Sequence, residues 1–215
     1  MICKQFFRRL AVAGGAMTLL AAMAAAQEVP RFTFAVGGGF TNPVGNTGRH
    51  LDEGWNIMAG GGINFSRYVG AMIDLGYNRF GINSVTLNNA GFPGGNVGVF
   101  SATLDPIVHL NPGHHVDVYA IGGGGLFRLE QQFTQPGVAT VTGFDPFFGF
   151  YNFGVPTTEI LSSYSVNKPG IDAGLGFAIG TRWHGKLFAE ARYDRIFMSD
   201  DRHEDYVPVS FGFRW

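Results

Sequence analysis

Charged residues at alternating positions are the residues of this chain best placed to do chemistry. Glu190, Arg192 and Asp194 occupy every second position of one stretch that is otherwise largely apolar. Side chains at such positions of an extended strand point to the same face, so charges of both signs would project into one interior. An unpaired charge in a narrow, poorly hydrated interior costs several kcal/mol, and ion pairs are therefore expected. The predicted network has seven members: Asp74, Asp172, Arg182, Glu190, Arg192, Asp194 and Arg214.

Two uses of this network remain open. Arg192 and Arg214 would anchor nearby carboxylates and lock a closed interior, or the same charges would line a path for protons or ions. A narrow interior enclosed by strands is usually filled by side chains, which favours the closed interior.

Nucleophilic catalysis is the other chemistry to consider. Serine, histidine and acidic residues are present at His50, Ser199, His203, Glu204, Asp205 and Ser210. A catalytic triad is defined by geometry, and this spacing does not supply it. His114 and His115 could bind a metal adventitiously, but adjacent residues of a strand point apart. We predict no enzyme activity, no cofactor and no metal site.

Eight stretches with strand character must position the charged residues. Each has roughly ten residues, the length of a transmembrane β-strand. They run approximately over 31–42, 54–66, 69–81, 97–110, 115–129, 169–183, 186–197 and 206–215.

The connections between these stretches alternate in length. Long ones follow the first, third, fifth and seventh stretches, at about 43–53, 82–96, 130–168 and 198–205. Tight turns follow the second, fourth and sixth. Long loops at one rim and short turns at the other are typical of bacterial outer-membrane barrels, with the long set outside the cell.

Each stretch has one apolar and one polar face. In the second, Trp55, Ile57 and Ile63 lie opposite Asn56 and Asn64. A secreted lipocalin-like barrel would turn the apolar face inward, and a membrane barrel would turn it outward. Small residues on the polar faces suit a narrow interior and favour the membrane barrel: Gly60, Gly62, Gly76, Gly174 and Gly176.

Aromatic residues gather near the ends of the stretches. Two girdles at the membrane interfaces are expected from such residues. We assign Trp55, Tyr77, Tyr193 and Tyr206 to the long-loop rim, and Phe65, Tyr68, Trp183 and Trp215 to the short-turn rim.

The N-terminus and the composition support export to a membrane. Residues 1–26 combine a basic start, an apolar stretch and Ala24-Ala25-Ala26, which predicts a cleaved signal peptide. The only cysteine, Cys3, would leave with it. Without Lys4, Arg8 and Arg9, the remaining 12 Lys and Arg face 16 Asp and Glu, a formal charge of −4 that argues against nucleic-acid binding.

The chain resembles the small outer-membrane β-barrel superfamily, which includes OmpA-like, OmpX-like and OmpW-like barrels. The resemblance rests on the signal peptide, the eight alternating strands, the asymmetric loops and the C-terminal pattern Phe211-x-Phe213-x-Trp215. It implies an all-β, eight-stranded antiparallel up-and-down transmembrane barrel over residues 27–215 in a Gram-negative outer membrane. It further implies contact with outer-membrane lipid and lipopolysaccharide, and recognition of Phe211, Phe213 and Trp215 by the outer-membrane assembly machinery.

The connection 130–168 is dense in aromatic residues, which mark an interaction site when they gather at a surface. The residues concerned are Phe144, Phe147, Phe148, Phe150, Tyr151 and Phe153. They would contact a partner, an apolar ligand or the outer leaflet, or else pack on one another or cap the barrel mouth. We expect a structural or surface-interaction role with an unknown surface partner; the alternative is a narrow channel or carrier for small hydrophobic or ionic solutes.

Two places leave the strand pattern less regular. Asp105-Pro106 interrupts the fourth stretch and predicts a bulge or an early strand end, because proline cannot donate a ladder hydrogen bond. The run from Gly122 to Gly125 leaves the register of the fifth stretch undetermined.

Overall fold

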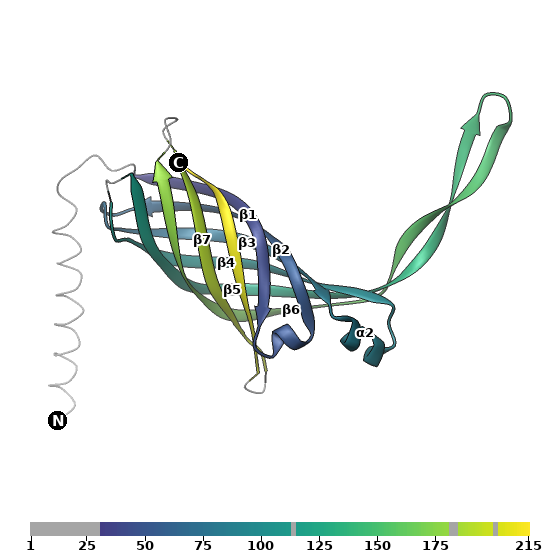
Figure 1. Cartoon of the computed structure of the whole chain (residues 1–215), viewed down its shortest axis with the longest axis horizontal. Helices are drawn as coiled ribbons and strands as arrows, with labels where there is room; N and C mark the ends of the chain where they lie inside the picture. The colour runs from purple at the N-terminus through teal and green to yellow at the C-terminus, as the bar shows by residue number, and fades with distance from the viewer. Residues whose placement is uncertain (1–30, 113–114, 181–184, 200–201) are drawn as a thin grey trace.

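Eight antiparallel strands close into a barrel in which each strand pairs with the next and β1 pairs with β8 (Figure 1). The computed structural model describes residues 31–112, 115–180, 185–199 and 202–215. Its strands are β1 (Phe32–Val44), β2 (Leu51–Asn64), β3 (Val69–Ile82), β4 (Gly94–His109), β5 (Val116–Asp145), β6 (Gly149–Gly180), β7 (Lys186–Phe197) and β8 (His203–Arg214). The predicted leader 1–26 lies outside the described residues, as do His114, Arg182 and Trp183.

Two short helices lie in the longer connections at one end of the barrel. The 3-10 helix η1 (Thr47–Arg49) joins β1 to β2, and α2 (Ser84–Ala90) joins β3 to β4. Asn83 caps α2 by accepting a hydrogen bond from the Val85 N–H, and Gly91 ends it with a left-handed φ of 74°. No helix in the described part of the chain combines the length and the apolar character needed to span a bilayer.

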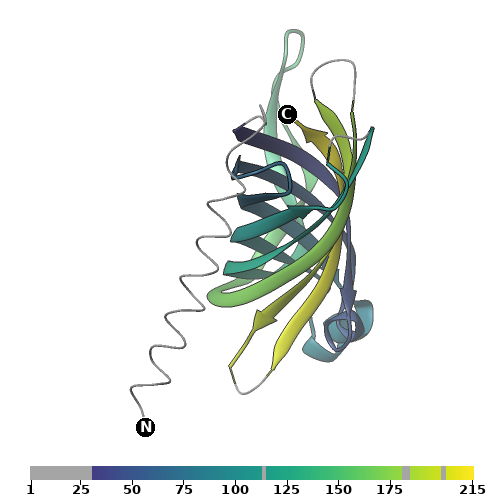
Figure 2. The ribbon, with the colours of Figure 1, turned by 90° about the vertical axis from the view of Figure 1, so that its left-hand side faces the viewer.

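The structure corrects the prediction of a long loop at 130–168. There β5 and β6 continue as a two-stranded hairpin that projects far beyond the barrel (Figures 1 and 2). The pairing runs from Glu130 with Ser165 to Asp145 with Gly149, with one register shift next to Phe133. Threonine, valine and aromatic residues favour extended structure, and they pair with each other here although neither face is covered by a core.

The predicted interruption at Asp105-Pro106 is also wrong. In the ladder with β3, Asp105 pairs with Met72 and Pro106 with Ala71 in unbroken register. On the other side, β5 pairs with Leu104 and then with Ile107 in the same register. The proline therefore leaves a local gap in one ladder and causes no bulge, and β4 extends to His109.

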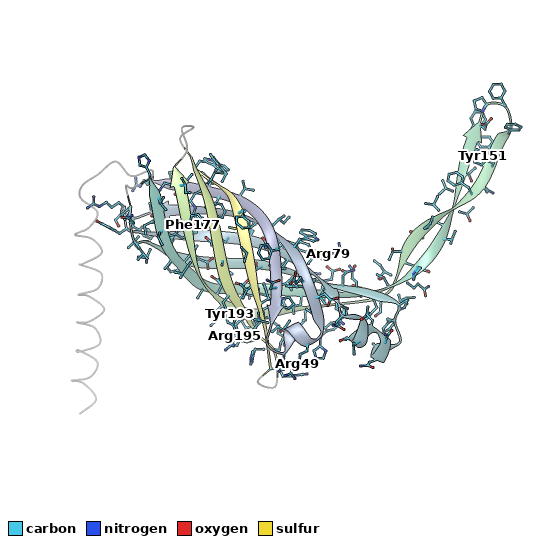
Figure 3. The ribbon with its side chains drawn as sticks, in the orientation of Figure 1. Arg49, Arg79, Tyr151, Phe177, Tyr193 and Arg195 are labelled. Atoms are coloured by element: carbon cyan, nitrogen blue, oxygen red, sulfur yellow. The ribbon has the colours of Figure 1, made fainter. Side chains whose placement is uncertain are left out.

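The outer wall carries the apolar face of every strand. Phe177 of β6 projects from this wall (Figure 3) and is 46% exposed. Trp55 and Tyr77 contact each other at the long-connection rim, with ring centroids 5.6 Å apart. Tyr206, which the sequence pattern places at the same rim, instead points inward and packs edge-on against Phe80. This correction follows from its register, because its neighbours Val207 and Val209 take the outward positions.

Glycines on the inner wall make room for large inward side chains. A Cβ atom on Gly176 would overlap the Tyr119 ring, and one on Gly60 would overlap an Asp74 carboxylate oxygen. The interior of an eight-stranded barrel is just wide enough for side chains to fill. Long inward side chains on some strands therefore fit only because inward residues on other strands are small.

Candidate functional site

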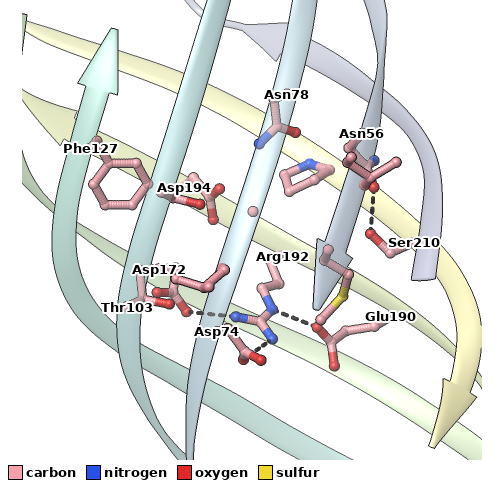
Figure 4. Close-up of a pocket in the computed structure, with 16 residues that line it drawn as sticks. Asn56, Asp74, Asn78, Thr103, Phe127, Asp172, Glu190, Arg192, Asp194 and Ser210 are labelled. Atoms are coloured by element: carbon pink, nitrogen blue, oxygen red, sulfur yellow. Dashed lines mark hydrogen bonds and ion pairs between the residues drawn. The ribbon is translucent and has the colours of Figure 1, made fainter. Parts of the chain in front are cut away.

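The centre of the barrel interior holds one arginine surrounded by carboxylates (Figure 4). Arg192 donates from Nη2 to Asp74 Oδ2 at 2.6 Å and from Nε to Glu190 Oε1 at 2.5 Å, and Figure 4 shows both contacts. It also donates from Nη1 to Asp105 Oδ2 at 2.7 Å. A fourth carboxylate, from Asp172, lies 3.7 Å from Nη1. The guanidinium group has five N–H donors in a fixed planar fork, so one side chain from β7 ties together β3, β4 and β6.

A second arginine extends this cluster toward the short-turn end. Arg214 Nη2 lies 3.6 Å from Glu190 Oε2 and 3.3 Å from the Tyr119 hydroxyl. Tyr119 in turn donates to Glu190 Oε2 at 2.9 Å. The Arg214 guanidinium also lies over the Tyr119 ring, 4.4 Å from its centroid. Glu190 is thus shared between both arginines, and the arginines of β7 and β8 join one network.

Negative groups outnumber positive ones in this layer. The buried carboxyl groups belong to Asp74, Asp105, Asp172, Glu190 and Asp194, and the arginines are Arg192 and Arg214. Asp194 Oδ1 and Asn78 Oδ1 have no hydrogen-bond partner among the described residues. Both residues line a cavity of about 40 Å³, which is large enough for water. The layer is therefore polar, contains more carboxyl groups than arginines and is held chiefly by Arg192.

Apolar layers lie on both sides of the charged layer. Toward the short turns, Met72, Ile107, Tyr119, Ile121 and Phe188 form one cluster with Ala35 and Ala178. Toward the long connections, a second cluster consists of Phe80, Ile82, Val97, Val99, Phe127, Ile196 and Tyr206. Tyr119 and Ile196 are fully buried. The charged residues are thus separated from both ends of the barrel by packed side chains.

The seven residues of the predicted charge network divide into three groups. Asp74, Asp172, Glu190 and Arg192 meet in one cluster, which Arg214 joins through Glu190. Asp194 is buried in the same layer without an ion pair to a described residue, and Arg182 lies outside the described residues.

Sequence reasoning misses Asp105, which it treats only as part of a strand-breaking dipeptide. The same alternation that finds the other carboxylates also reaches Asp105, because it follows the inward positions Val99, Ser101 and Thr103. Thr103 donates from its hydroxyl to Asp105 Oδ2 at 2.7 Å.

The C-terminal aromatic residues lie on the outer wall. Phe211 is 54% exposed and Trp215 is 52% exposed. The Trp215 ring contacts those of Phe34 and Phe213. Backbone hydrogen bonds of 2.8 and 2.9 Å join Trp215 to Phe34 of β1, so the last residue of the chain helps to close the barrel.

The aromatic residues of 144–153 lie at the tip of the β5–β6 hairpin, away from the barrel mouth (Figures 1 and 3). Phe147 and Phe148 are 91% and 88% exposed. The Asp145 carboxylate accepts hydrogen bonds from both of their backbone N–H groups. Phe144 and Phe150 pair across the strands, and Tyr151 contacts Phe153. The tip is therefore an ordered turn that presents its aromatic rings outward.

The serine and histidine residues considered for catalysis have other partners. Ser210 donates to Asn56 Oδ1 inside the barrel, and Ser199 accepts from Lys168 Nζ. His203 Nε2 lies 3.4 Å from Asp205, and His50 lies next to Thr86. Across the described segments, no three His, Cys, Asp or Glu residues are arranged to hold a metal ion.

Comparison with known proteins gives a family and a fold. The model of the outer membrane protein beta-barrel domain matches residues 13–213. No curated protein matches the chain. Among solved structures, Neisserial surface protein A (NspA) is similar with 13% identity and a TM-score of 0.54, over 85% of this chain and 95% of that one.

Two further solved structures are similar at lower scores. Ail, the attachment invasion locus protein of Yersinia pestis, has 18% identity and a TM-score of 0.47 over 86% of this chain and 99% of its own. OprG from Pseudomonas aeruginosa has 11% identity and a TM-score of 0.46 over 85% and 95%. The family match, the closed eight-stranded ring and the apolar outer wall agree with one another: the chain belongs to the outer membrane protein β-barrel family and is a barrel of the bacterial outer membrane.

Proposed function

We propose that this protein is a non-conducting outer-membrane anchor that presents the β5–β6 hairpin as an attachment surface. The observation that carries the proposal is the hairpin tip, where Phe147 and Phe148 are almost fully exposed at the far end of two paired strands. Burying a phenylalanine side chain is favourable by about 1.5–3 kcal/mol. A cluster of such side chains on an ordered, projecting tip therefore favours binding to an apolar surface.

The rest of the distal hairpin supports an apolar, uncharged contact. Val141 pairs with Phe153 and Ala139 with Val155, and these pairs alternate with pairs that include Thr142 and Asn152 on the opposite face. Charged residues are rare here: between 131 and 167 the chain has only Asp145 and Glu159. One face of the distal hairpin is thus apolar and the tip presents aromatic rings around Asp145, and this stretch of the sequence has no basic residue to select an anionic surface.

The barrel interior supports anchoring over transport. The alternative of a narrow channel or carrier requires a continuous path, whereas the Arg192 layer lies between two apolar clusters with fully buried members. An ion entering either cluster would lose its hydration without gaining a charged partner. We therefore assign the specificity of the protein to its surface and a structural role to its interior.

Outer-membrane lipid and lipopolysaccharide are the surroundings we propose for the outer wall. Arg79 and Arg128 project from that wall at the positions paired with Trp55 and Phe100, near the long-connection rim. Guanidinium groups recognise phosphate by paired hydrogen bonds, so both are suited to lipopolysaccharide phosphates. We also propose that residues 1–26 are a cleaved signal peptide. The outer-membrane assembly machinery is proposed to recognise Phe211, Phe213 and Trp215.

The attachment proposal is tested with whole cells on alkyl-coated glass. We expect cells that display the wild-type protein to attach more strongly than cells with Phe147, Phe148 and Phe150 each changed to Ser, by roughly tenfold, since three exposed rings are lost. The count of attached cells under flow is the measurement, with uncoated glass as the reference surface.

The matched control is the double variant Val138→Ser, Ile160→Ser. It removes two exposed apolar side chains from the same hairpin but leaves the tip intact, and it should attach like the wild type. Heat-modifiable gel mobility verifies that all variants form equal amounts of folded barrel. If the tip variant attaches as strongly as the wild type, the hairpin tip is not the attachment surface.

A further inference from the structure

A pocket of about 640 Å³ opens at the long-connection end of the barrel. Its upper walls come from four separate connections, represented by Thr47 of η1, Thr86 of α2, Tyr164 at the base of the hairpin and His203 at the start of β8. Binding sites for small molecules have volumes of roughly 300–1,000 Å³. The pocket therefore has the size of a ligand site, and the surface-exposed connections jointly enclose it.

The floor of this pocket is apolar and sealed. Phe80, Val97, Val99, Ile196 and Tyr206 line it and belong to the buried cluster above the Arg192 layer. An apolar floor of this kind binds an apolar body by removing it from water. Because packed side chains separate the floor from the charged layer, a molecule that enters from outside would bind there and not pass through.

The mouth of the pocket presents an arginine. Arg49 lines it, and among the described lining residues the carboxylate is that of Glu204. Glu204 Oε2 accepts a hydrogen bond of 2.7 Å from the Thr47 hydroxyl. Arg49 is exposed at the end of η1 (Figure 3), and its side chain has no partner among the described residues. The Arg49 guanidinium is therefore available to bind an anionic group at the mouth.

We propose that this pocket binds an amphipathic anion, with its apolar body on Val97, Val99 and Ile196 and its carboxylate, sulfate or phosphate headgroup at Arg49. A body of roughly 10–20 non-hydrogen atoms suits a pocket of this size. The proposal concerns the barrel mouth and is independent of the hairpin tip.

Decanoate is the probe, and methyl NMR of the labelled protein in phosphatidylcholine nanodiscs is the measurement. We expect the methyl signals of Val97, Val99 and Ile196 to shift with decanoate and to saturate. The methyl groups of Ile73 and Ile171, on the outer wall, report partition of decanoate into the bilayer in the same sample. Decyltrimethylammonium has the same chain with the opposite charge and should shift the pocket signals less than decanoate does at the same concentration.

Two arginine variants test the headgroup assignment. Arg49→Gln should weaken decanoate binding by roughly two- to fivefold, the effect of an exposed ion pair, whereas Arg31→Gln, at the opposite end of the barrel, should leave it unchanged. Nanodiscs that contain phosphatidylglycerol without decanoate distinguish a lipid headgroup from a free amphiphile: shifts of the pocket methyls there would support the proposal with lipid as the source. Pocket signals that follow the outer-wall signals, or equal binding of the cationic amphiphile, would overturn it.

Discussion

Replacing Arg192 by methionine is expected to lower the free energy of unfolding of the barrel by roughly 3–5 kcal/mol. The methionine has a similar length but leaves Asp74, Asp105 and Glu190 without the donor that each now contacts within 2.7 Å. Removing one partner from a buried ion pair costs far more than the pair itself contributes, because an uncompensated charge stays behind. Urea unfolding in lipid vesicles, followed by tryptophan fluorescence, measures the change.

The control for this substitution is Arg79→Met, which removes an arginine of the outer wall that has no partner among the described residues. It should change stability by less than about 1 kcal/mol. Adding Asp74→Asn and Glu190→Gln to Arg192→Met should recover part of the loss, because fewer charges are left unpaired. If the Arg192→Met barrel is as stable as the wild type, the cluster does not hold the strands together.

Replacing Gly176 by valine is the second change with a large expected effect, a loss of about 3 kcal/mol or failure to fold. The new Cβ would lie 2.5 Å from the Tyr119 hydroxyl oxygen and closer still to the ring, far inside van der Waals contact. Tyr119 has little freedom to move, because its hydroxyl binds Glu190 and its ring packs against Arg214. The fraction that folds is read from heat-modifiable gel mobility, and its stability from urea unfolding.

Gly180→Val provides a control in the same strand, because a Cβ at Gly180 meets nothing within 4 Å. It should leave folding nearly unchanged, so strand propensity alone would not explain an effect at Gly176. In a chain that already carries Tyr119→Ala, Gly176→Val should cost much less than in the wild type. The same cost in both backgrounds would contradict the steric explanation.

Much of the barrel follows from the sequence, because a strand between lipid and a filled interior must alternate. Trp55 and Ile57 face outward and Asn56 inward for the same reason that Glu190 and Arg192 share a face. Alternation does not show which inward side chains contact each other across the barrel. Period two places Asp105 inward as well, but only the register between β3, β4 and β7 brings it to Arg192.

The hairpin is beyond sequence reasoning for a physical reason. Most of its residues beyond Thr134 are exposed on both faces, so no core imposes a regular alternation of apolar and polar residues. Pairing with the facing strand is what makes this segment extended, and strand pairing between distant residues leaves little trace in a single sequence.

The position of Tyr206 is hard to predict for a related reason: an aromatic near a strand end suits either the outer rim or the interior.

Single-channel recording in planar bilayers distinguishes a closed interior from an ion path through the barrel. Protein extracted from outer membranes is reconstituted after gel mobility has shown that the barrel is folded, with a porin in the same bilayers as a conducting reference. The folded protein is expected to show no discrete openings. Steady openings of uniform size would contradict it and would make Asp74, Glu190, Arg192 and Asp194 the lining of an ion path.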